Sequence, residues 1–380
     1  MVEVIIVGVD HHNTLGVIES LGIKGVRSDV VIYSSKSWSY VLKSKYVQSG
    51  HICKSEENII ACLLDNYKTE NGKKIIIATS DDVAVILDKN HQVLEDYFFL
   101  PNTVPSGSLS SKMSKEYMTS LAKRVGLDVP RTWVVEDGTI PRDIEYPCIT
   151  KAISSVEGSK DNIKVCKSES DLKHFLSNKT HCKTIQIQKY IEKEFEFQFL
   201  GCSLDRGNTI IIPGRTHIDR PNGMDNTFFL SFNTYEPELE ETVSKVKSFI
   251  KETGYSGPFS FEFLRDKNNG KSYFTEMNYR NDGNAVCVTK AGMNIPYIMY
   301  LYYSGKDYME EINHSSIHQV YLLPEFYYFK RMLAGEFGFK EWLSNVKKAD
   351  VCTTYFKDDK KPFAWFVLQI FDHILDRLRK

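Results

Sequence analysis

The sequence predicts an α/β fold at its N-terminal end, built on a doubly wound parallel sheet, followed by an α+β region. The chain has 380 residues, enough for roughly two or three domains. A continuous apolar run over 2–9 is typical of a strand buried on both faces, and strands expected at 30–33 and 74–78 alternate with helices at 14–21 and 59–67. This alternation indicates a parallel sheet whose ligand site lies at the carboxyl ends of the strands.

Polar residues follow two of the predicted strands and are expected in one crevice. They are Asp10, His11, His12, Ser80 and Asp81. The two histidines have two interpretations, as substrate contacts or as residues that start a helix. The segment after the first strand lacks the GxGxxG glycines that a dinucleotide requires, and the chain contains no GxxxxGK[ST] loop. A bound ATP would therefore be held by other means.

The remaining chain is punctuated by turn formers and short strands. Residues 101–110 are rich in turn formers and mark a boundary, and Ser114 is expected to cap a helix that ends before Gly126. A turn at 266–270 predicts a hairpin. The other predicted strands are 132–135, 148–152, 163–166, 184–188, 196–204, 209–212, 259–264 and 272–277, with helices at 171–176 and 239–253.

Composition limits the function classes. The formal net charge of -1 gives no field that would attract nucleic acid. None of the eight cysteines forms a CxxC pair, which argues against a zinc site and a disulfide framework. The first residues are expected to form a strand rather than a signal peptide, and no apolar stretch of about 18 residues could span a bilayer. We therefore expect a reducing, cytoplasmic setting.

The predicted final hairpin carries the most informative residues. Side chains alternate across a strand, so Glu276, Asn278 and Arg280 should share one face, and cross-strand pairing can bring Glu262 onto it. Two carboxylates and an amide oxygen are hard ligands suited to Mg²⁺, and an arginine beside them can neutralise phosphoryl oxygens. From spacing alone, an exposed hairpin face with incidental charges remains an alternative.

The segment from Glu276 to Arg280 resembles the ExNxR signature of ATP-grasp ligases, with Glu262 where they place a second metal carboxylate. Three further segments resemble the family in the same order: Ser114-Lys115, with Ser in place of Asp, then 146–151, then 188–191. Residues 20–25 and 44–47 are similar to the branch that contains D-aspartate ligases.

This resemblance implies a Rossmann-like pre-ATP-grasp domain over 1–108 and a two-lobed ATP-grasp fold over 109–312. The small lobe would span about 109–190 and the large lobe 191–312. Residues 313–380 would form a C-terminal helical extension. The predicted fold class is thus α/β and α+β.

The resemblance also implies site residues. The cofactors would be ATP and Mg²⁺, with Mn²⁺ as a substitute. Two lysines would contact phosphates, although each could be a solvated surface residue. Glu194 and Glu196 compete for the ribose. Arg215 and His217 would share a strand face near the transferred phosphoryl group, with a charged hairpin tip as the alternative. The full set is Lys115 and Lys151 for phosphates; Gln188, Lys189 and Ile191 for adenine; Glu194 or Glu196 for ribose; Glu262, Glu276 and Asn278 for metal; Arg280, Arg215 and His217 for catalysis.

One departure is the loop 153–162, which has a single glycine where the family is glycine-rich. The implied reaction is ATP-dependent joining of a small-molecule carboxylate to an amine through an acyl-phosphate, with release of ADP and phosphate. An amino acid such as aspartate is the first candidate acid. Alternatives are a nucleotide-binding protein without turnover and a nicotinamide-dependent oxidoreductase. The sequence does not name the acid or the amine.

The last segment, 363–378, predicts an apolar helix. We expect it to pack on the core or on a second subunit, which would make a homodimer. The alternative is peripheral membrane contact through 363–380, where Arg377, Arg379 and Lys380 would suit anionic headgroups and Asp372 and Asp376 would oppose it.

Overall fold

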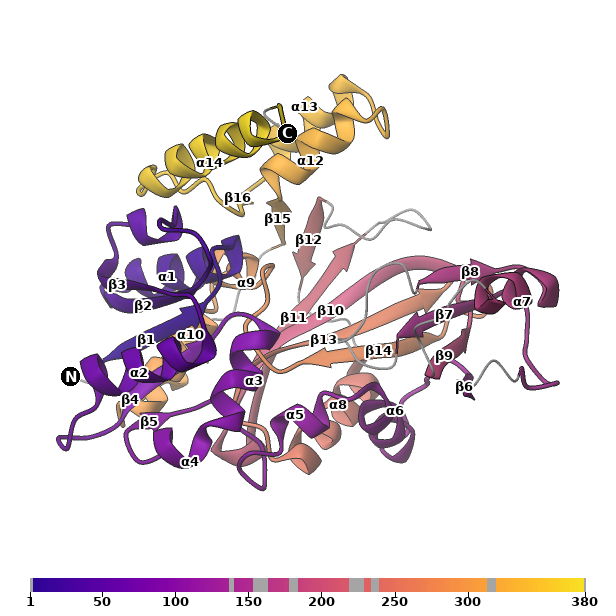
Figure 1. Cartoon of the computed structure of the whole chain (residues 1–380), viewed down its shortest axis with the longest axis horizontal. Helices are drawn as coiled ribbons and strands as arrows, with labels where there is room; N and C mark the ends of the chain where they lie inside the picture. Colours follow the sequence, from indigo (N-terminus) through magenta and orange to yellow (C-terminus); the bar gives the residue numbers. More distant parts are fainter. Residues whose placement is uncertain are drawn as a thin grey trace.

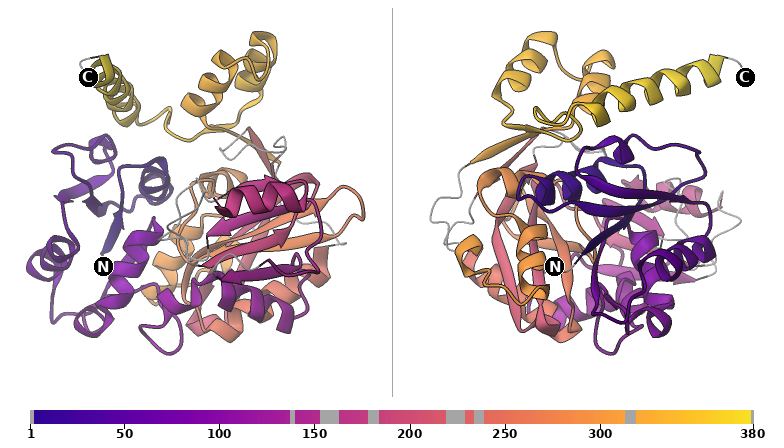
Figure 2. Two further views of the ribbon diagram at one scale, coloured as in Figure 1. Left: turned by 45° about the vertical axis from the view of Figure 1, so that its right-hand side comes forward. Right: turned by 90° about the vertical axis from the view of Figure 1, so that its left-hand side faces the viewer.

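The structure is a computed structural model, and it describes residues 3–136, 140–152, 163–177, 184–218, 229–233, 239–312 and 319–378. Three sheets organise these residues (Figure 1). A parallel sheet forms the N-terminal domain, a large and mainly antiparallel sheet forms the centre, and a small sheet lies at the outer end of the large one (Figures 1 and 2). The α/β and α+β classes predicted from sequence are confirmed.

The N-terminal sheet has five parallel strands in the order β3-β2-β1-β4-β5. Three of them were predicted. The β3 strand was not, because it lies at the sheet edge and its polar residues are partly exposed, which removes the apolar run. The strands are β1 (Val4–Gly8), β2 (Ser28–Tyr33), β3 (Val47–Cys53), β4 (Lys74–Ala78) and β5 (Phe98–Phe99).

Helices cover both faces of this sheet, which explains its continuous apolar strands. On one face, α1 (His12–Gly22) packs with α10 (Ile295–Tyr303), which belongs to a distant part of the chain. On the other face lie α2 (Glu56–Tyr67) and α3 (Asp81–Lys89). The core of the N-terminal domain is therefore completed by a helix from the region that follows the predicted hairpin at 259–277.

A connecting segment leads to the small lobe. It contains α4 (His91–Leu94), α5 (Leu109–Lys112) and α6 (Lys115–Arg124). The Ser114 side chain accepts a hydrogen bond from the Tyr117 amide at 3.2 Å, and Gly126 takes a φ of 82° after the helix, so both predicted helix ends are confirmed.

The small lobe is an antiparallel sheet in the order β6-β9-β7-β8, with α7 (Glu169–Ser177) on one face. Ile185 and Ile187 join the α7 core, so Gln186 and Gln188 lie on the opposite face of the central strand. The strands are β6 (Thr132–Glu136), β7 (Cys148–Ala152), β8 (Lys164–Cys166) and β9 (Thr184–Lys189).

The large sheet has the order β14-β13-β10-β11-β12-β15-β16. One face is a row of phenylalanines that packs on α6 and on α8 (Glu240–Thr253). The opposite face is apolar where it packs on α10, and it carries polar side chains, including Gln198 and Glu262, at the part that forms the site. The strands are β10 (Lys193–Leu204), β11 (Thr209–Ile218), β12 (Leu230–Asn233), β13 (Gly257–Asp266), β14 (Ser272–Asn278), β15 (Val320–Leu323) and β16 (Val351–Cys352).

The β11 strand runs six residues further than predicted, past Pro213 and Gly214. These residues suggest a strand end from sequence alone. At Gly214, however, an added Cβ would lie 2.1 Å from the Asn233 carbonyl oxygen. The glycine therefore permits the close approach of β12 and does not terminate the strand.

The C-terminal segment is less separate than predicted, because β15 and β16 extend the large sheet. Its helices are α12 (Glu325–Leu333), α13 (Phe339–Lys348) and α14 (Lys361–Leu378), preceded by α9 (Val286–Ala291) and α11 (Met309–Ile312). Helix α14 begins against the N-terminal domain and then extends away from it (Figure 2). None of the helices in the described ranges is long and apolar enough to cross a membrane.

A pair of buried asparagine side chains joins the N-terminal domain to the segment just after β14. The Asn13 Nδ2 donates to the carbonyls of Thr79, at 2.8 Å, and Asn281, at 2.5 Å. In return, the Asn281 Nδ2 donates to the Asn13 Oδ1 at 2.6 Å. Both side chains are under 5% exposed, so the hydrogen bonds are not exchanged for water.

We predict that Asn13→Ala lowers the free energy of unfolding by about 2 kcal/mol, because it leaves buried polar groups unsatisfied. Urea unfolding followed by tryptophan fluorescence measures this. The control is Asn66→Ala on the exposed face of α2, where we expect a change within about 0.5 kcal/mol. Equal losses in the two variants would contradict the role of the amide pair.

Candidate active site

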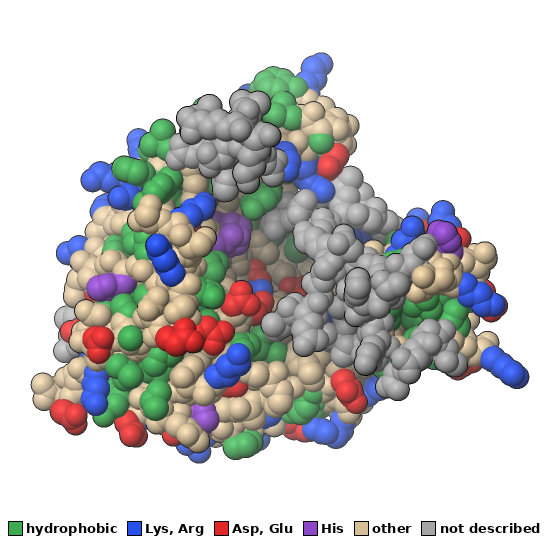
Figure 3. Space-filling view, in the orientation of Figure 1, with side chains coloured by type: hydrophobic (Ala, Val, Ile, Leu, Met, Phe, Trp, Pro, Cys, Tyr) green, Lys and Arg blue, Asp and Glu red, His purple; other side chains and the backbone are tan. Residues whose placement is uncertain are grey.

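A cleft of about 720 Å³ lies between the carboxyl edge of the N-terminal sheet and the polar face of the large sheet. Figure 3 shows this hollow, with histidine and acidic side chains inside it. Residues from both domains line it: His11, His12, Ser80, Asp81, Glu196, Gln198, Glu262, Glu276, Arg280, Asp282 and Asn284. Four of the five expected crevice residues of the N-terminal domain therefore meet the expected hairpin residues, whereas Asp10 lines a smaller cavity beside the cleft.

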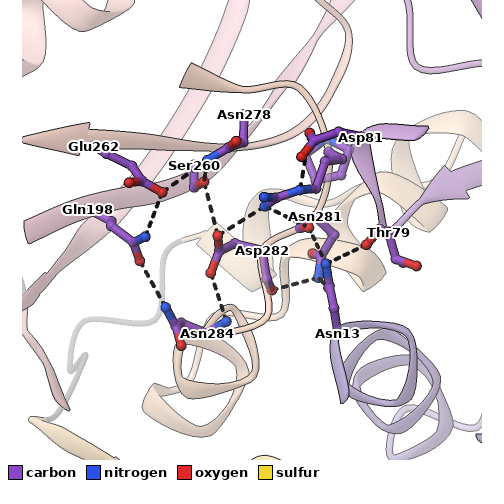
Figure 4. A network of polar contacts seen from close by, with 12 residues as sticks. Asn13, Thr79, Asp81, Gln198, Ser260, Glu262, Asn278, Asn281, Asp282 and Asn284 are labelled. Atoms are coloured by element: carbon purple, nitrogen blue, oxygen red, sulfur yellow. Dashed lines mark hydrogen bonds and ion pairs between the residues drawn. The ribbon is translucent and has the colours of Figure 1, made fainter. Parts of the chain in front are cut away.

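Glu262 and Glu276 lie directly opposite each other in the β13–β14 pairing. Glu262 is oriented by two amides, because its Oε1 accepts hydrogen bonds from Gln198 Nε2 at 2.9 Å and Asn278 Nδ2 at 3.0 Å (Figure 4). Asn278 also donates to Ser260 Oγ at 3.0 Å, which leaves its amide oxygen as an acceptor. The predicted sharing of one face by Glu262, Glu276 and Asn278 is present in the fold.

Burial raises the pKa of Glu262 to about 8, and the neighbouring Glu276 and Asp282 add to this effect. Arg280 and the Gln198 hydrogen bond oppose it. The site therefore carries more negative charge than its surroundings compensate, and a divalent cation would relieve it.

These residues fit Mg²⁺ as a partial ligand set. Within the described ranges, no group of three or more His, Cys, Asp or Glu side chains is arranged to hold a metal. Mg²⁺ commonly binds one or two carboxylates and takes other oxygens from phosphate and water. Glu262, Glu276 and Asn278 match that pattern, with the other ligands supplied by a nucleotide.

Arg280 lies just past the end of β14 and not within the strand, as the predicted alternation had assumed. Its guanidinium pairs with Asp282 at 3.0 Å and with Asp81 of the N-terminal domain at 3.4 Å (Figure 4). Burial disfavours its charge, but Asp81, Asp282 and Glu262 together raise the pKa of Arg280 above its ordinary value. It stays a cation in the cleft.

His11 and His12 follow β1 and line the cleft. The His11 ring accepts from the Asn13 amide at 3.3 Å and so caps α1, which fits the helix-entry interpretation without excluding a ligand contact. Burial, with Arg280 adding to it, lowers the pKa of His11, and burial lowers that of His12 further. Both rings are neutral near pH 7. Gly283 passes so close that a Cβ there would lie 2.6 Å from the His12 Nε2.

Lys115 is the first residue of α6, which packs against β14. Burial lowers the pKa of Lys115, while the charge of Glu276 opposes this shift. The helix thus brings the lysine within electrostatic range of the carboxylate pair, although the two are far apart in sequence.

The expected adenine segment lies at the end of β9. Gln188 is 9% exposed, and its amide donates to Thr132 Oγ1 at 3.3 Å. The Lys189 ammonium points to Glu145 at 2.7 Å, and its amide donates to the Arg131 carbonyl, so its own carbonyl is the group suited to a ligand. Ile191 is 5% exposed.

The structure separates Glu194 from Glu196. A bulge in β10 between Lys193 and Phe195 makes Glu194 an extra residue, and its side chain is exposed. Glu196 lines the cleft and pairs with Lys193 at 2.5 Å. Without the bulge, the regular alternation of side chains along a strand would have placed both glutamates on one face.

Arg215 and His217 differ from the prediction. They share one face of β11, as expected. However, Arg215 pairs with Phe199 of β10 and so lies on the phenylalanine face of the large sheet, whereas Gln198 and Glu262 pair with each other on the opposite face, which lines the cleft. The Arg215 guanidinium lies over the rings of Phe195 and Phe197, and His217 stacks on Phe195 at 4.2 Å. Because strand alternation turns them away from the cleft, we do not retain them as catalytic candidates.

Some predicted residues lie wholly or partly outside the described residues. The backbone of Lys151 pairs with Gln186 in β7, but its side chain lies outside the described residues, as do the loop 153–162 and the segment 219–228.

Four further residues of the site were not predicted: Gln198, Ser260, Asp282 and Asn284. Asp282 accepts from Ser260 Oγ at 3.1 Å and from the Asn284 amide at 2.8 Å, and the Asn284 side chain donates to Gln198 Oε1 at 3.0 Å. Asp282 and Asn284 closely follow the ExNxR segment, and this run of polar residues could have indicated from sequence that they belong to the site. No sequence feature indicated Gln198, because its contact with Glu262 depends on the pairing of β10 with β13.

Residues 114–301, just under half the chain, match the family described as the carbamoyl-phosphate synthase L chain, ATP binding domain. This match and the two-lobed fold confirm the ATP-grasp architecture that the sequence resemblance implied. Among curated proteins, none matches its sequence.

Solved structures agree on the fold. An L-amino acid ligase from Bacillus licheniformis is 14% identical, with a TM-score of 0.63 over 84% of this chain and 78% of that one. The biotin carboxylase domain of the Hydrogenobacter thermophilus 2-oxoglutarate carboxylase, in complex with MgADP, ADP and bicarbonate, is 20% identical, with a TM-score of 0.63 over 80% and 70%. The N5-carboxyaminoimidazole synthetase from Staphylococcus aureus is 16% identical, with a TM-score of 0.61 over 80% and 78%. At these identities the likeness establishes the fold alone.

We predict that Glu262→Gln changes how stability depends on pH in metal-free buffer. The folded pKa of Glu262 is about 8, above its ordinary value, so wild-type stability falls as pH rises toward 8 and the buried group must ionise. Glutamine keeps the Oε1 acceptor and cannot ionise. Relative to wild type, the variant should gain about 2 kcal/mol between about pH 6 and about pH 9. Parallel stability curves from urea unfolding would contradict the raised pKa.

A second prediction uses the two neighbouring glutamates of β10. Glu196→Gln should raise the KM for ATP about tenfold, as expected for loss of one charged hydrogen bond to a ribose hydroxyl. Glu194→Gln, with an exposed side chain on the same strand, should leave KM unchanged. The measurement is ADP release against ATP concentration. The reverse ranking would reassign the ribose contact to Glu194.

Proposed function

We propose that this protein is an ATP-dependent carboxylate–amine ligase that forms an amide through an acyl-phosphate. The observation that carries the proposal is the opposed Glu262 and Glu276 pair, with Asn278 and Arg280, in the cleft of an ATP-grasp fold. A charge cluster of this kind suits a reaction whose main requirement is to position and neutralise phosphoryl oxygens.

The chain's residues would divide the work by position. Glu262, Glu276 and Asn278 hold Mg²⁺, which when bound supplies positive charge to the phosphoryl oxygens, and Mn²⁺ is a chemically equivalent substitute. Arg280 places a permanent cation at the junction with the N-terminal domain. Lys115 adds a second cation from α6, and Lys151 is the expected third.

Nucleotide recognition would fall to the hinge between the lobes. Gln188, the Lys189 carbonyl and the Ile191 amide would contact the adenine edge, and Glu196 would accept from the ribose. The support is the burial of Gln188 and Ile191 and the position of Glu196 in the cleft.

The proposed reaction has two steps. A substrate carboxylate attacks the γ-phosphorus of ATP, which gives the acyl-phosphate and ADP. A substrate ammonium then loses its proton, its nitrogen forms the amide bond, and the acyl–oxygen bond breaks. The second step yields amide, hydrogen phosphate and one proton. No protein nucleophile takes part.

The setting we propose is the cytoplasm, where ATP is available. The seven described cysteines are all free, which suits a reducing compartment. We propose aspartate or another small amino acid as the first acid to try. A homodimer and a membrane contact through 363–380 stay as predictions.

We predict that turnover releases ADP and phosphate, never AMP and pyrophosphate, because the charged groups gather where outer phosphates would lie. With the correct acid and no amine, hydroxylamine should trap the acyl-phosphate as a hydroxamate. Glu276→Gln should reduce hydroxamate formation on the order of 10² or more. Glu240→Gln on the exposed end of α8 is the matched control. Detection of AMP would overturn the mechanism, and full activity in Glu276→Gln would overturn the metal site.

A further inference from the structure

A second cavity of about 250 Å³ lies beside the cleft. Its walls come from the N-terminal domain, through Asp10, Lys36 and Tyr40, and from the C-terminal segment, through Phe326, Phe366 and Gln369. His11, His12 and Tyr327 line both the cleft and this cavity. The two spaces therefore adjoin at the histidines.

Asp10 is a partly buried carboxylate whose charge is not balanced by the protein. Its Oδ1 accepts from Ser39 Oγ at 2.5 Å, and its Oδ2 accepts from Gln369 Nε2 at 2.6 Å. Both partners are neutral, and each oxygen keeps a further lone pair. No ion pair among the described residues includes Asp10. A carboxylate withdrawn from water in this way favours a cation.

Lys36, whose side chain carries the opposite charge, also lines this cavity. In the described part of the chain it forms no ion pair, either with Asp10 or with another acid. The wall thus holds one negative and one positive group that do not neutralise each other. An occupant with both charges, held apart by its own skeleton, would satisfy the two together.

The surroundings add little competing charge. The Glu325 carboxylate, near the cavity wall, accepts hydrogen bonds from five donors, which are the backbone amides and hydroxyls of Thr353 and Thr354 and the Tyr355 amide. The lowered pKa values of His11 and His12 keep both rings neutral, so they do not repel a cation.

Aromatic side chains enclose the space. The rings of Tyr40 and Phe366 lie 5.1 Å apart, and those of Phe326 and Phe366 lie 6.0 Å apart. Tyr40 is 2% exposed. An aromatic wall beside a carboxylate is suited to an ammonium group.

We propose that this cavity binds the amine substrate as a compact zwitterion such as an α-amino acid, with its ammonium on Asp10 and its anionic group on Lys36. The volume corresponds to on the order of eight water molecules, which suits a ligand of about ten non-hydrogen atoms. The inference rests on the proposed ligase function. It assigns to the C-terminal segment, through Phe366 and Gln369, a part in choosing the substrate.

The position of the cavity suits the second step. An amine held on Asp10 would lie in the cavity that adjoins the cleft at His11 and His12. On losing its proton, its nitrogen would attack an acyl-phosphate formed in the cleft, with the two histidines at the junction between the two spaces. The anionic group, held by Lys36, would orient the nitrogen toward the cleft.

The first test uses the unaltered full-length protein with Mg-ADP. Thermal melting is measured with the common L-α-amino acids and their D forms as probes. An amino acid that binds should raise the melting temperature by about 2 °C at saturating concentration. Its decarboxylated amine and its N-acetyl derivative should each lose the shift, because each lacks one of the two charges. Equal shifts with either analogue, or no shift with any amino acid, would overturn the proposal.

The second test uses charge-removing variants of the cavity. Asp10→Asn and Lys36→Gln should weaken binding of the same amino acid at least tenfold and leave the Mg-ADP shift unchanged. In Asp10→Asn, Gln369 can rotate its amide and keep its hydrogen bond. Asp65→Asn and Lys123→Gln, which are exposed and do not line the cavity, are the matched controls. Wild-type amino-acid affinity in both cavity variants would overturn the assignment.

Hydroxylamine separates this inference from the function on which it rests. It is small and uncharged, so it needs neither Asp10 nor Lys36. Hydroxamate formation that is intact in Asp10→Asn, with amide formation reduced, supports the cavity. Absence of hydroxamate in the wild-type protein with every acid would defeat the ligase function itself. Intact amide formation in both cavity variants would defeat the cavity alone.

Discussion

The excess of carboxylates at the junction of the two domains is the constraint on which the rest of the site depends. Glu262, Glu276, Asp282 and Asp81 line one cleft, and Arg280 is the cation that holds two of them. Without further positive charge, the site keeps a proton on Glu262, as its raised pKa shows. A cleft of this composition is electrostatically incomplete, and Mg²⁺ with a nucleotide is the partner that would complete it.

The two sides of the cleft are held together because neither domain builds its core alone. Helix α10 covers the N-terminal sheet, although it follows the β13–β14 hairpin in sequence. The Asn13–Asn281 pair then fixes the β1 edge against the hairpin end. The C-terminal segment is joined as firmly, because β15 and β16 extend the large sheet and Gln369 reaches Asp10. A ligand in the cleft or beside it therefore contacts elements that are held in register by shared packing.

Much of the fold could be predicted from periodicity. The strands β1, β4, β7 and β14 lie where alternation and apolar runs indicated, and Ser114 and Gly126 end their helix as expected. Two strands were harder: β3 lies at a sheet edge and is too polar to show an apolar run, and β11 continues past Pro213 and Gly214, whereas the expected strand ended at residue 212. In both cases a neighbouring strand decided the outcome.

The sequence by itself determined the resemblance to ATP-grasp ligases and the face that Glu262, Glu276 and Asn278 share, because these three residues are local to two adjacent strands and obey their alternation. Only the tertiary structure decided the rest of the site. A bulge separated Glu194 from Glu196, and strand register turned Arg215 and His217 toward the phenylalanine core. The cavity formed by Asp10, Lys36 and Gln369 joins residues more than 300 positions apart in sequence. Local patterns report which face of an element a residue occupies, whereas long-range packing decides what that face meets.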